Sequence, residues 1–162
     1  MKRILEGEKE TISKVTKTCS TVEKSNYSKI MNEPFAVVRA AGSLGVDLVA
    51  VRGDISFLTE VKSRNGKTIH FSSMGGKLQQ QAEQMKTVCE KTKTLPVYAY
   101  RLKGLRGDSW RFFTIDLNHL KGIANILHRR LPKLETSKSG NFVMRWNKGM
   151  PLSDFISYLC KK

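Results

Sequence analysis

Apolar residues recur at helical spacing in four parts of the chain. Ser20-Thr-Val-Glu23 has the form of a capping box ahead of an apolar stripe, so the sequence predicts a helix over 20–32. Apolar positions three and four residues apart predict a second helix over 77–92 and a further helical segment over 117–129. A last helix is predicted near the C-terminus, with one apolar stripe made of Leu152, Phe155, Ile156 and Leu159.

Runs of β-branched and aromatic residues predict strands between these helices. The runs are 35–39, 46–51, 57–62, 96–102, 110–115 and 142–144. Arg52-Gly-Asp-Ile55 predicts a tight turn that joins the second and third runs into a hairpin. The polar stretches 63–76 and 135–141 are predicted as loops. This order of elements predicts an α/β fold with a central mixed β-sheet flanked by α-helices.

The length of 162 residues fits a single domain with a sizeable core. Residues 1–18 are polar with weak periodicity, and we interpret them as a frayed or helical N-terminal extension of a domain over 19–162. No apolar run approaches the ~18 residues of a membrane span, and no signal-peptide pattern opens the chain, so we expect a soluble cytoplasmic protein. The three cysteines and three histidines lack ligand spacing and are interpreted as ordinary core or surface residues.

The formal charge of +15, from 29 basic and 14 acidic residues, predicts a polyanionic partner. Residues 1–30 carry +3, residues 31–116 carry +5 and residues 117–162 carry +7, so the excess is spread through the fold. Nucleic acid is the commonest such partner. The alternatives are a merely solubilising surface and, less favoured, an anionic membrane, for which the chain shows no basic amphipathic helix with an aromatic face.

The predicted hairpin brings two acids together. With a turn centred between Gly53 and Asp54, the numbers of opposed residues sum to 107, which places Asp47 across from Glu60. Opposed side chains on one face lie about 5 Å apart, and like charges there destabilise the pair unless a cation compensates them. Strand alternation puts Lys62 on that same face. The alternative is that these are solvated residues at a sheet edge.

This set of residues suits metal-assisted hydrolysis of phosphodiesters. Mg²⁺ prefers hard oxygen ligands and needs only one or two carboxylates beside a phosphate oxygen. The ion polarises the phosphate and lowers the pKa of a bound water, and Lys62 can orient that water or neutralise developing charge. The pattern predicts a magnesium-dependent nuclease. A Gly-rich loop that carries Ser43 lies beside these residues.

Several blocks of the sequence, in order and at matching spacing, closely resemble the archaeal Holliday junction resolvases. The blocks are Glu23, 35–43, 46–50, 60–62, 110–113 and 142–152. The resemblance implies a restriction-endonuclease-like core and a homodimeric endonuclease that depends on Mg²⁺, with Mn²⁺ able to substitute. It further implies that the protein recognises four-way DNA junctions by shape and introduces paired nicks. Relative to that family, residues 117–140 form a longer connection.

The resemblance also assigns roles to single residues. It makes Asp47 and Glu60 metal ligands, Lys62 the catalytic lysine and Glu23 a further acid of the metal site, although Glu23 also fits a capping residue. Ser43 belongs to both the catalytic and the DNA-binding set. The resemblance places Lys24, Arg39 and Ser43 at or near DNA, and Arg64 and Lys67, in the polar stretch after Lys62, are further DNA-binding candidates. The basic cluster over 128–133 either widens the DNA footprint or forms a solvated face.

Two symmetric nicks require two active sites, which a C2 dimer supplies. The stripe of the last helix and the strand over 110–115 are candidate dimer surfaces, and core packing explains either equally well. Two other functions stay open at this stage. One is a related nuclease that cuts flaps, damaged DNA or duplex, and the other is a non-catalytic DNA- or RNA-binding module.

Overall fold

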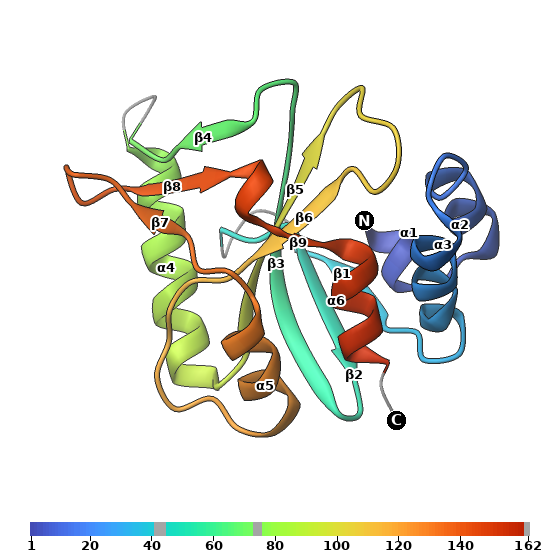
Figure 1. The fold of residues 1–162 in the computed structure, drawn as a ribbon. Helices are drawn as coiled ribbons and strands as arrows, with labels where there is room; N and C mark the ends of the chain where they lie inside the picture. Colours follow the sequence, from blue (N-terminus) through green and yellow to red (C-terminus); the bar gives the residue numbers. More distant parts are fainter. Residues whose placement is uncertain (41–44, 73–75, 161–162) are drawn as a thin grey trace.

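The computed structural model describes residues 1–40, 45–72 and 76–160, and its centre is a six-stranded mixed sheet (Figure 1). The strand order is β1-β2-β3-β5-β6-β9, and β3 and β5 run parallel while the other neighbours run antiparallel. The strands are β1 (Ala36–Arg39), β2 (Leu48–Arg52), β3 (Ile55–Arg64), β5 (Leu95–Leu102), β6 (Trp110–Phe113) and β9 (Met150–Pro151). A second, three-stranded sheet has the order β4-β8-β7, with β4 (Thr68–His70), β7 (Glu135–Thr136) and β8 (Phe142–Arg145).

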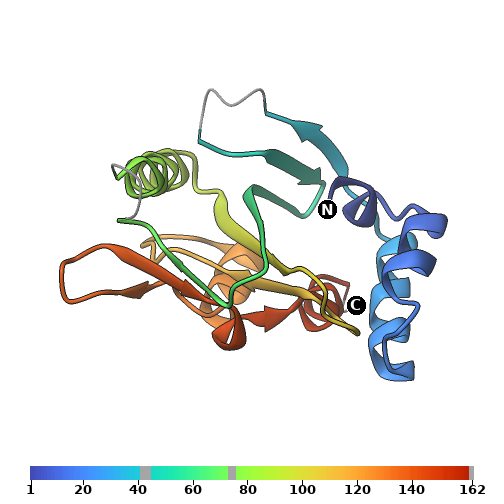
Figure 2. The same ribbon diagram turned by 90° about the horizontal axis from the view of Figure 1, so that it is seen from above.

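Helices cover both faces of the central sheet. In Figure 2, α4 (Lys77–Thr92) lies on one side, and α5 (Gly122–Arg130) and α6 (Leu152–Leu159) lie on the other. Alternation along β3 explains this arrangement. Phe57 packs edge to face on Phe155 of α6, whereas Glu60 and Lys62 point to the opposite face, which α4 covers together with Phe71. No helix in these described residues combines the length and apolar character that a bilayer span requires.

The structure confirms most of the predicted elements. The first predicted helix is α3 (Thr21–Ser28), continued by the 3-10 turn η1 (Lys29–Met31), and the predicted helix over 77–92 is α4. The helix expected over 117–129 begins only at Gly122. The reason is local, because His119 has φ 68° and Lys121 is extended at the N-cap, so the chain turns before the helix starts. The short strands β4 and β7 lie in stretches that the sequence predicted as loops.

The N-terminal extension is packed onto the domain. It forms α1 (Lys2–Leu5) and α2 (Lys9–Val15), and Ile4, Leu5 and Ile12 are buried in the same core as the central sheet. The backbone N–H of Phe35 donates to the carbonyl of Leu5 at 2.9 Å. Residues 1–15 are therefore an ordered part of the fold, and the fraying that the polar pattern suggested is not observed.

The candidate dimer surfaces lie inside the protomer. All four residues of the apolar stripe on α6 are buried, and Phe112 and Phe155 stack with ring centroids 4.5 Å apart. Trp110 and Ile115, at the two ends of the other candidate strand, are buried as well. Core packing, the alternative reading of these stripes, is the one the structure supports.

A buried carboxylate ties α3, α6 and the β5–β6 loop together. Asp108 is 4% exposed, and its Oδ1 accepts from the Tyr27 hydroxyl at 2.9 Å and from the Trp110 N–H at 3.2 Å. Its Oδ2 accepts from the Ser153 N–H at 2.8 Å, one of the otherwise unpaired donors in the first turn of α6. The side chain thus joins three segments that are far apart in the sequence.

Removing this carboxylate should destabilise the fold strongly. We expect Asp108→Ala to lower the free energy of unfolding by about 3 kcal/mol, because it leaves a hydroxyl and backbone donors buried without a partner. Tyr27→Phe removes one bond and one donor together, so we expect a loss of about 1 kcal/mol. Urea denaturation followed by circular dichroism measures both. Equal losses of unfolding free energy in the two variants would contradict the conclusion that Asp108 holds three segments together.

Candidate active site

The register of the β2–β3 hairpin is the one that the sequence predicted. Leu48 pairs with Thr59 and Arg52 pairs with Ile55, so the numbers of paired residues sum to 107. Asp47 lies in a bend just before this ladder begins: its carbonyl accepts from the Ala40 N–H and its N–H donates to the Thr59 carbonyl, both at 3.0 Å. The second bond is shifted by one residue from the predicted register, which therefore ends at Leu48. The Asp47 side chain still lies close enough to Glu60 to raise the pKa of that carboxyl, so the two acids are brought together as expected.

The two carboxylates differ in environment. Glu60 is 6% exposed in the middle of the sheet, where β5 places Tyr98 beside it. Asp47 is exposed, and its Oδ2 accepts from the backbone N–H of Val61 at 2.7 Å. This hydrogen bond holds the Asp47 carboxylate in an exposed position, whereas the Glu60 carboxylate is buried in the sheet.

Lys62 is the cation that the buried acid requires. Its Nζ lies 2.5 Å from Oε1 of Glu60, and the two side chains are 17% and 8% exposed. Burial nevertheless raises the pKa of the Glu60 carboxyl above its ordinary value; Lys62 opposes the rise and the nearby Asp47 adds to it. The lysine thus compensates the buried charge only in part.

A hollow opens next to Asp47 on the β1 side. Its volume is about 460 Å³, and Arg39, Leu48 and Val61 line it together with the first residues of the chain. Lys2 reaches this hollow from α1, where its ammonium donates to the Val37 carbonyl at 2.8 Å and pairs with Glu6. Lys2 could not be predicted from the sequence, because nothing in a polar N-terminal segment indicates which strand it packs against.

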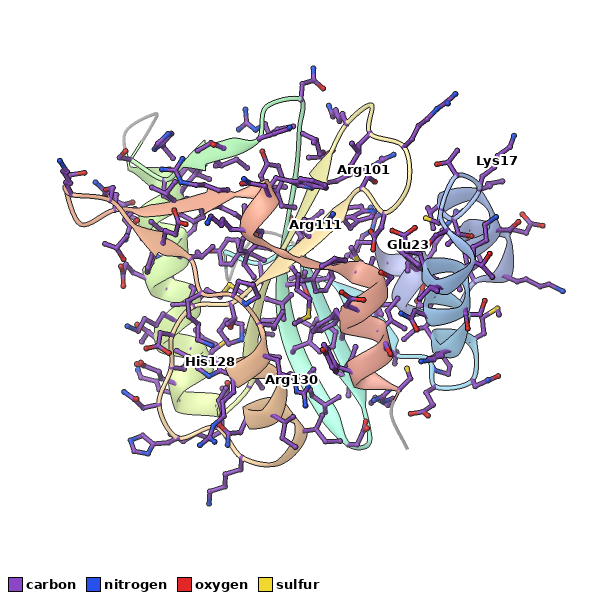
Figure 3. All side chains as sticks on the ribbon, viewed as in Figure 1. Lys17, Glu23, Arg101, Arg111, His128 and Arg130 are labelled. Atoms are coloured by element: carbon purple, nitrogen blue, oxygen red, sulfur yellow. The ribbon has the colours of Figure 1, made fainter. Side chains whose placement is uncertain are left out.

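Glu23 is not brought to Asp47 and Glu60. It completes the predicted capping box: its Oε2 accepts from the Ser20 N–H at 2.7 Å, and its own N–H donates to Ser20 Oγ at 3.3 Å. Its charge acts on Cys19, Tyr27 and Arg111, the last labelled near it in Figure 3. In the described part of the chain, no three acids, histidines or cysteines gather closely enough to hold a metal ion. A metal role for Glu23 stays a prediction that rests on the resemblance alone.

The predicted DNA-binding residues are exposed and come from different elements. Arg39 ends β1 beside the hollow, and Arg64 and Lys67 follow Lys62 at the end of β3. Lys24 lies on α3, next to Glu23 in the chain. Ser43 lies outside the described residues. Arg39 therefore lies beside Asp47, while Arg64 and Lys67 lie further along the chain, at the end of β3 and just after it.

The basic cluster over 128–133 is neither wholly solvated nor free. His128 is 6% exposed and its Nε2 lies 3.1 Å from both the Leu117 N–H and the Ile115 carbonyl. Lys133 turns back to the carbonyls of His128 and Leu131, while Arg130 lies over the Tyr158 ring at 4.4 Å. Much of this cluster holds the connection after α5 in place.

The donor set fits a divalent cation that prefers oxygen. Two carboxylates face each other across a hairpin, one of them exposed and fixed by a backbone N–H and the other buried with only partial compensation. Mg²⁺ keeps several of its waters and needs no more than such a pair of acids beside a phosphate. Neither sulfur nor imidazole belongs to the pair, so the set does not suit a structural zinc site.

Comparison with solved structures finds the Hjc protein of Archaeoglobus fulgidus, described as a Holliday junction resolvase from an archaeal hyperthermophile. The two chains are 22% identical and superpose with a TM-score of 0.51, over 75% of this chain and 81% of that one. At this identity the likeness establishes the fold, which is the restriction-endonuclease-like α/β core expected from the sequence. No curated protein sequence matches the chain.

The sequence profile of the family described as archaeal Holliday junction resolvase (Hjc) matches residues 15–130, which is most of the chain. This span contains the hairpin with Asp47, Glu60 and Lys62, as well as α3, α4 and most of the central sheet. The protein therefore belongs to the archaeal Holliday junction resolvase family and is a junction-resolving nuclease.

Proposed function

We propose that the protein resolves four-way DNA junctions by metal-dependent hydrolysis of one phosphodiester in each of two strands. The observation that carries the proposal is that Asp47, Glu60 and Lys62 lie together: Lys62 pairs with Glu60 at 2.5 Å, and Asp47 is close enough to raise the pKa of the Glu60 carboxyl. A protein that only bound DNA would have no use for two acids facing a phosphate, because each one repels it.

In this proposal Asp47 and Glu60 hold a Mg²⁺ ion. When bound, the ion polarises the scissile phosphate and lowers the pKa of a coordinated water. Lys62 pairs with the Glu60 carboxylate at 2.5 Å. Its ammonium can shift from Glu60 toward the phosphate and stabilise the charge that develops on the oxygens during hydrolysis.

The proposed reaction needs two copies of this site. A four-way junction has approximate two-fold symmetry, so a C2 dimer would present one acid pair to each of two opposed strands. The stripes that the sequence offered as dimer surfaces are buried, so the dimer would use another surface. Because its substrate would be chromosomal DNA, we place the protein in the cytoplasm with the nucleoid.

The direct test is incubation with a synthetic four-way junction, labelled on each strand in turn, with Mg²⁺ or with EDTA. We expect symmetric nicks in opposed strands with Mg²⁺, no nicks with EDTA, and no cutting of linear duplex of the same sequence. Tight junction binding without nicks would refute the proposal in favour of a binding module. Equal cutting of every substrate would make the protein a general nuclease.

Substitution of the exposed acid should separate cutting from binding. We expect Asp47→Asn to lower the cleavage rate by at least about 100-fold, because an amide is a poor ligand for Mg²⁺. Junction affinity should be unchanged or higher, since one negative charge near the phosphate is gone. Single-turnover cleavage and gel-shift titration measure the two effects.

The matched control is Asp54→Asn at the other end of the same hairpin, where Asp54 pairs with Arg52 at 2.6 Å. This change also removes one negative charge but lies away from the proposed site, so cleavage should stay near that of the wild type. Normal cleavage by Asp47→Asn would show that the site has been assigned to the wrong residues.

The buried acid should make stability depend on pH in a direction opposite to that of most carboxyl groups. Because its pKa is raised in the folded protein, Glu60 binds a proton more readily there than in the unfolded chain. Its charge therefore costs stability above that pKa, and the cost disappears as the pH falls. We expect Glu60→Gln to be more stable than the wild type at pH 7 in EDTA, and the difference to shrink toward pH 4.5.

Urea denaturation at the two pH values measures this difference. Glu135→Gln is the control, since Glu135 is exposed on β7 with Arg145 at 2.8 Å, and its substitution should change little. A Glu60→Gln variant that is less stable than the wild type at pH 7 would mean that Lys62 compensates the buried charge fully.

A further inference from the structure

Three loops meet beyond the acid pair, at the end of the sheet where β3 and β5 finish. They are the β3–β4 loop, the β5–β6 loop and the 3-10 turn η2 (Trp146–Lys148) (Figure 1). Each loop carries exposed cations. We call this set the basic platform, and it consists of Arg64, Lys67, Lys103, Arg106 and Lys148.

Backbone hydrogen bonds hold the three loops together. The N–H of Lys103 donates to the Arg64 carbonyl at 2.9 Å, which joins the β5–β6 loop to the end of β3. The N–H of Trp146 donates to the Lys67 carbonyl at 2.7 Å, and its indole Nε1 donates to the Ser109 carbonyl at 3.0 Å. The guanidinium of Arg111 lies 3.9 Å from the centre of the Trp146 ring. These contacts thus hold the three loops of the platform together without a ligand.

The platform carries no compensating acids. Residues 62–70, 101–107 and 145–149 contain eight lysines and arginines and no aspartate or glutamate, and the nearest acid in the chain, Asp108, is buried under three hydrogen bonds. None of the five platform cations forms an ion pair with another described residue. By comparison, Lys2 pairs with Glu6 and Arg145 pairs with Glu135. Unpaired like charges that are held close together repel one another, and a polyanion relieves that repulsion.

The position of the platform relative to the acid pair points to a particular part of the substrate. Glu60 lies on β3, Asp47 directly precedes β2, and Arg39 lies on the β1 side of them. The platform lies at the far end of β3 and on the β5–β6 loop, and its first member along the chain, Arg64, is four residues after Glu60 on β3. At about 3.3 Å per strand residue, the platform begins roughly 13 Å from Glu60. This separation exceeds the reach of contacts to the scissile phosphate itself. Lys148 lies outside residues 15–130, so part of the platform belongs to this chain beyond the family match.

We propose that the basic platform binds the sugar–phosphate backbone of the duplex arm on one side of the scissile phosphate. This inference rests on the proposed function, because it takes junction DNA as the ligand. The contacts are to phosphates and not to bases, since lysine and arginine side chains on preformed loops match backbone charge without reading sequence. The platform contributes to binding and has no part in the hydrolysis at Asp47 and Glu60.

The test compares two triple variants of equal net charge. Lys67, Lys103 and Lys148, one from each loop, are changed to alanine in the first. The control changes Lys91, Lys93 and Lys121 to alanine; all three are exposed and lie at the opposite end of the sheet, where β3 and β5 begin. Junction dissociation constants are measured from 50 to 200 mM salt in EDTA, and single-turnover cleavage is measured with Mg²⁺ at saturating protein.

We expect the platform variant to bind the junction more weakly and with a shallower salt dependence. If three phosphate contacts are lost, the slope of the log association constant against log salt concentration becomes shallower by about 2.7. The ratio of wild-type to variant affinity should therefore fall about 40-fold between 50 and 200 mM salt. The control should bind like the wild type, and saturated cleavage should stay within about threefold in both variants.

Three results would overturn the inference. Unchanged binding by the platform variant would show that these loops do not touch DNA. Equal weakening in the two variants would assign the effect to net charge and not to the platform. Loss of saturated cleavage with normal binding would place the platform in the chemical step. A wild-type protein that binds junctions without nicking them would refute the proposed function alone, because the platform test measures binding.

Discussion

The candidate site depends on one constraint, which is that a carboxylate is buried in the centre of the sheet at a fixed register. Glu60 lies on β3, between β2 and β5, where it is 6% exposed. A shift of the β2–β3 hairpin by one residue would turn Glu60 toward α6 and Phe57 toward α4, so the apolar pattern of β3 and the position of its acid specify each other. The turn reinforces this register, since Arg52 bonds Asp54 through both Nε and Nη2. The core therefore fixes the position of the acid, and the acid is tolerated only because Lys62 accompanies it.

The two faces of the central sheet have different roles: one contributes mainly to stability, and the other carries the candidate site. The face under α5 and α6 is filled by aromatic and aliphatic side chains such as Phe57, Phe112 and Phe155. The face under α4 is apolar near the turn but becomes polar toward the end of β3, where Glu60 and Lys62 point. The site is thus supported from behind by a close-packed core, and its side chains have little freedom to move away from the positions that hydrolysis needs. Asp108 extends this support by holding α3 and α6 against the β5–β6 loop.

Features that depend on interactions between residues close together in the sequence could be predicted from local sequence patterns. The capping box predicted the start of α3, the apolar spacing predicted α4, and the symmetry of a two-residue turn predicted the β2–β3 register from Leu48 to Ile55, because each depends on a few neighbouring residues. The sequence could not show where α1 packs, that the α6 stripe faces its own core, or that β4 pairs with β8, since these depend on contacts between distant segments. Glu23 illustrates the limit. Its capping role was predicted from residues 20–23 alone, whereas its distance from Asp47 depends on how α3 docks on α6.

The distribution of charge explains how a protein of +15 can contain an acidic site at all. Two acids at the centre repel a phosphate, so the binding energy for DNA must come from cations placed around them. Arg39 on the β1 side and the basic platform at the far end of β3 meet this need without neutralising Asp47 and Glu60, because Arg39 lies on another strand and the platform lies further along the sheet. Cations closer to the pair would compete with a metal ion for its carboxylates, as Lys62 already does. Separation of binding charge from catalytic charge therefore lets one surface both attract a polyanion and hold a cation at the bond to be cut.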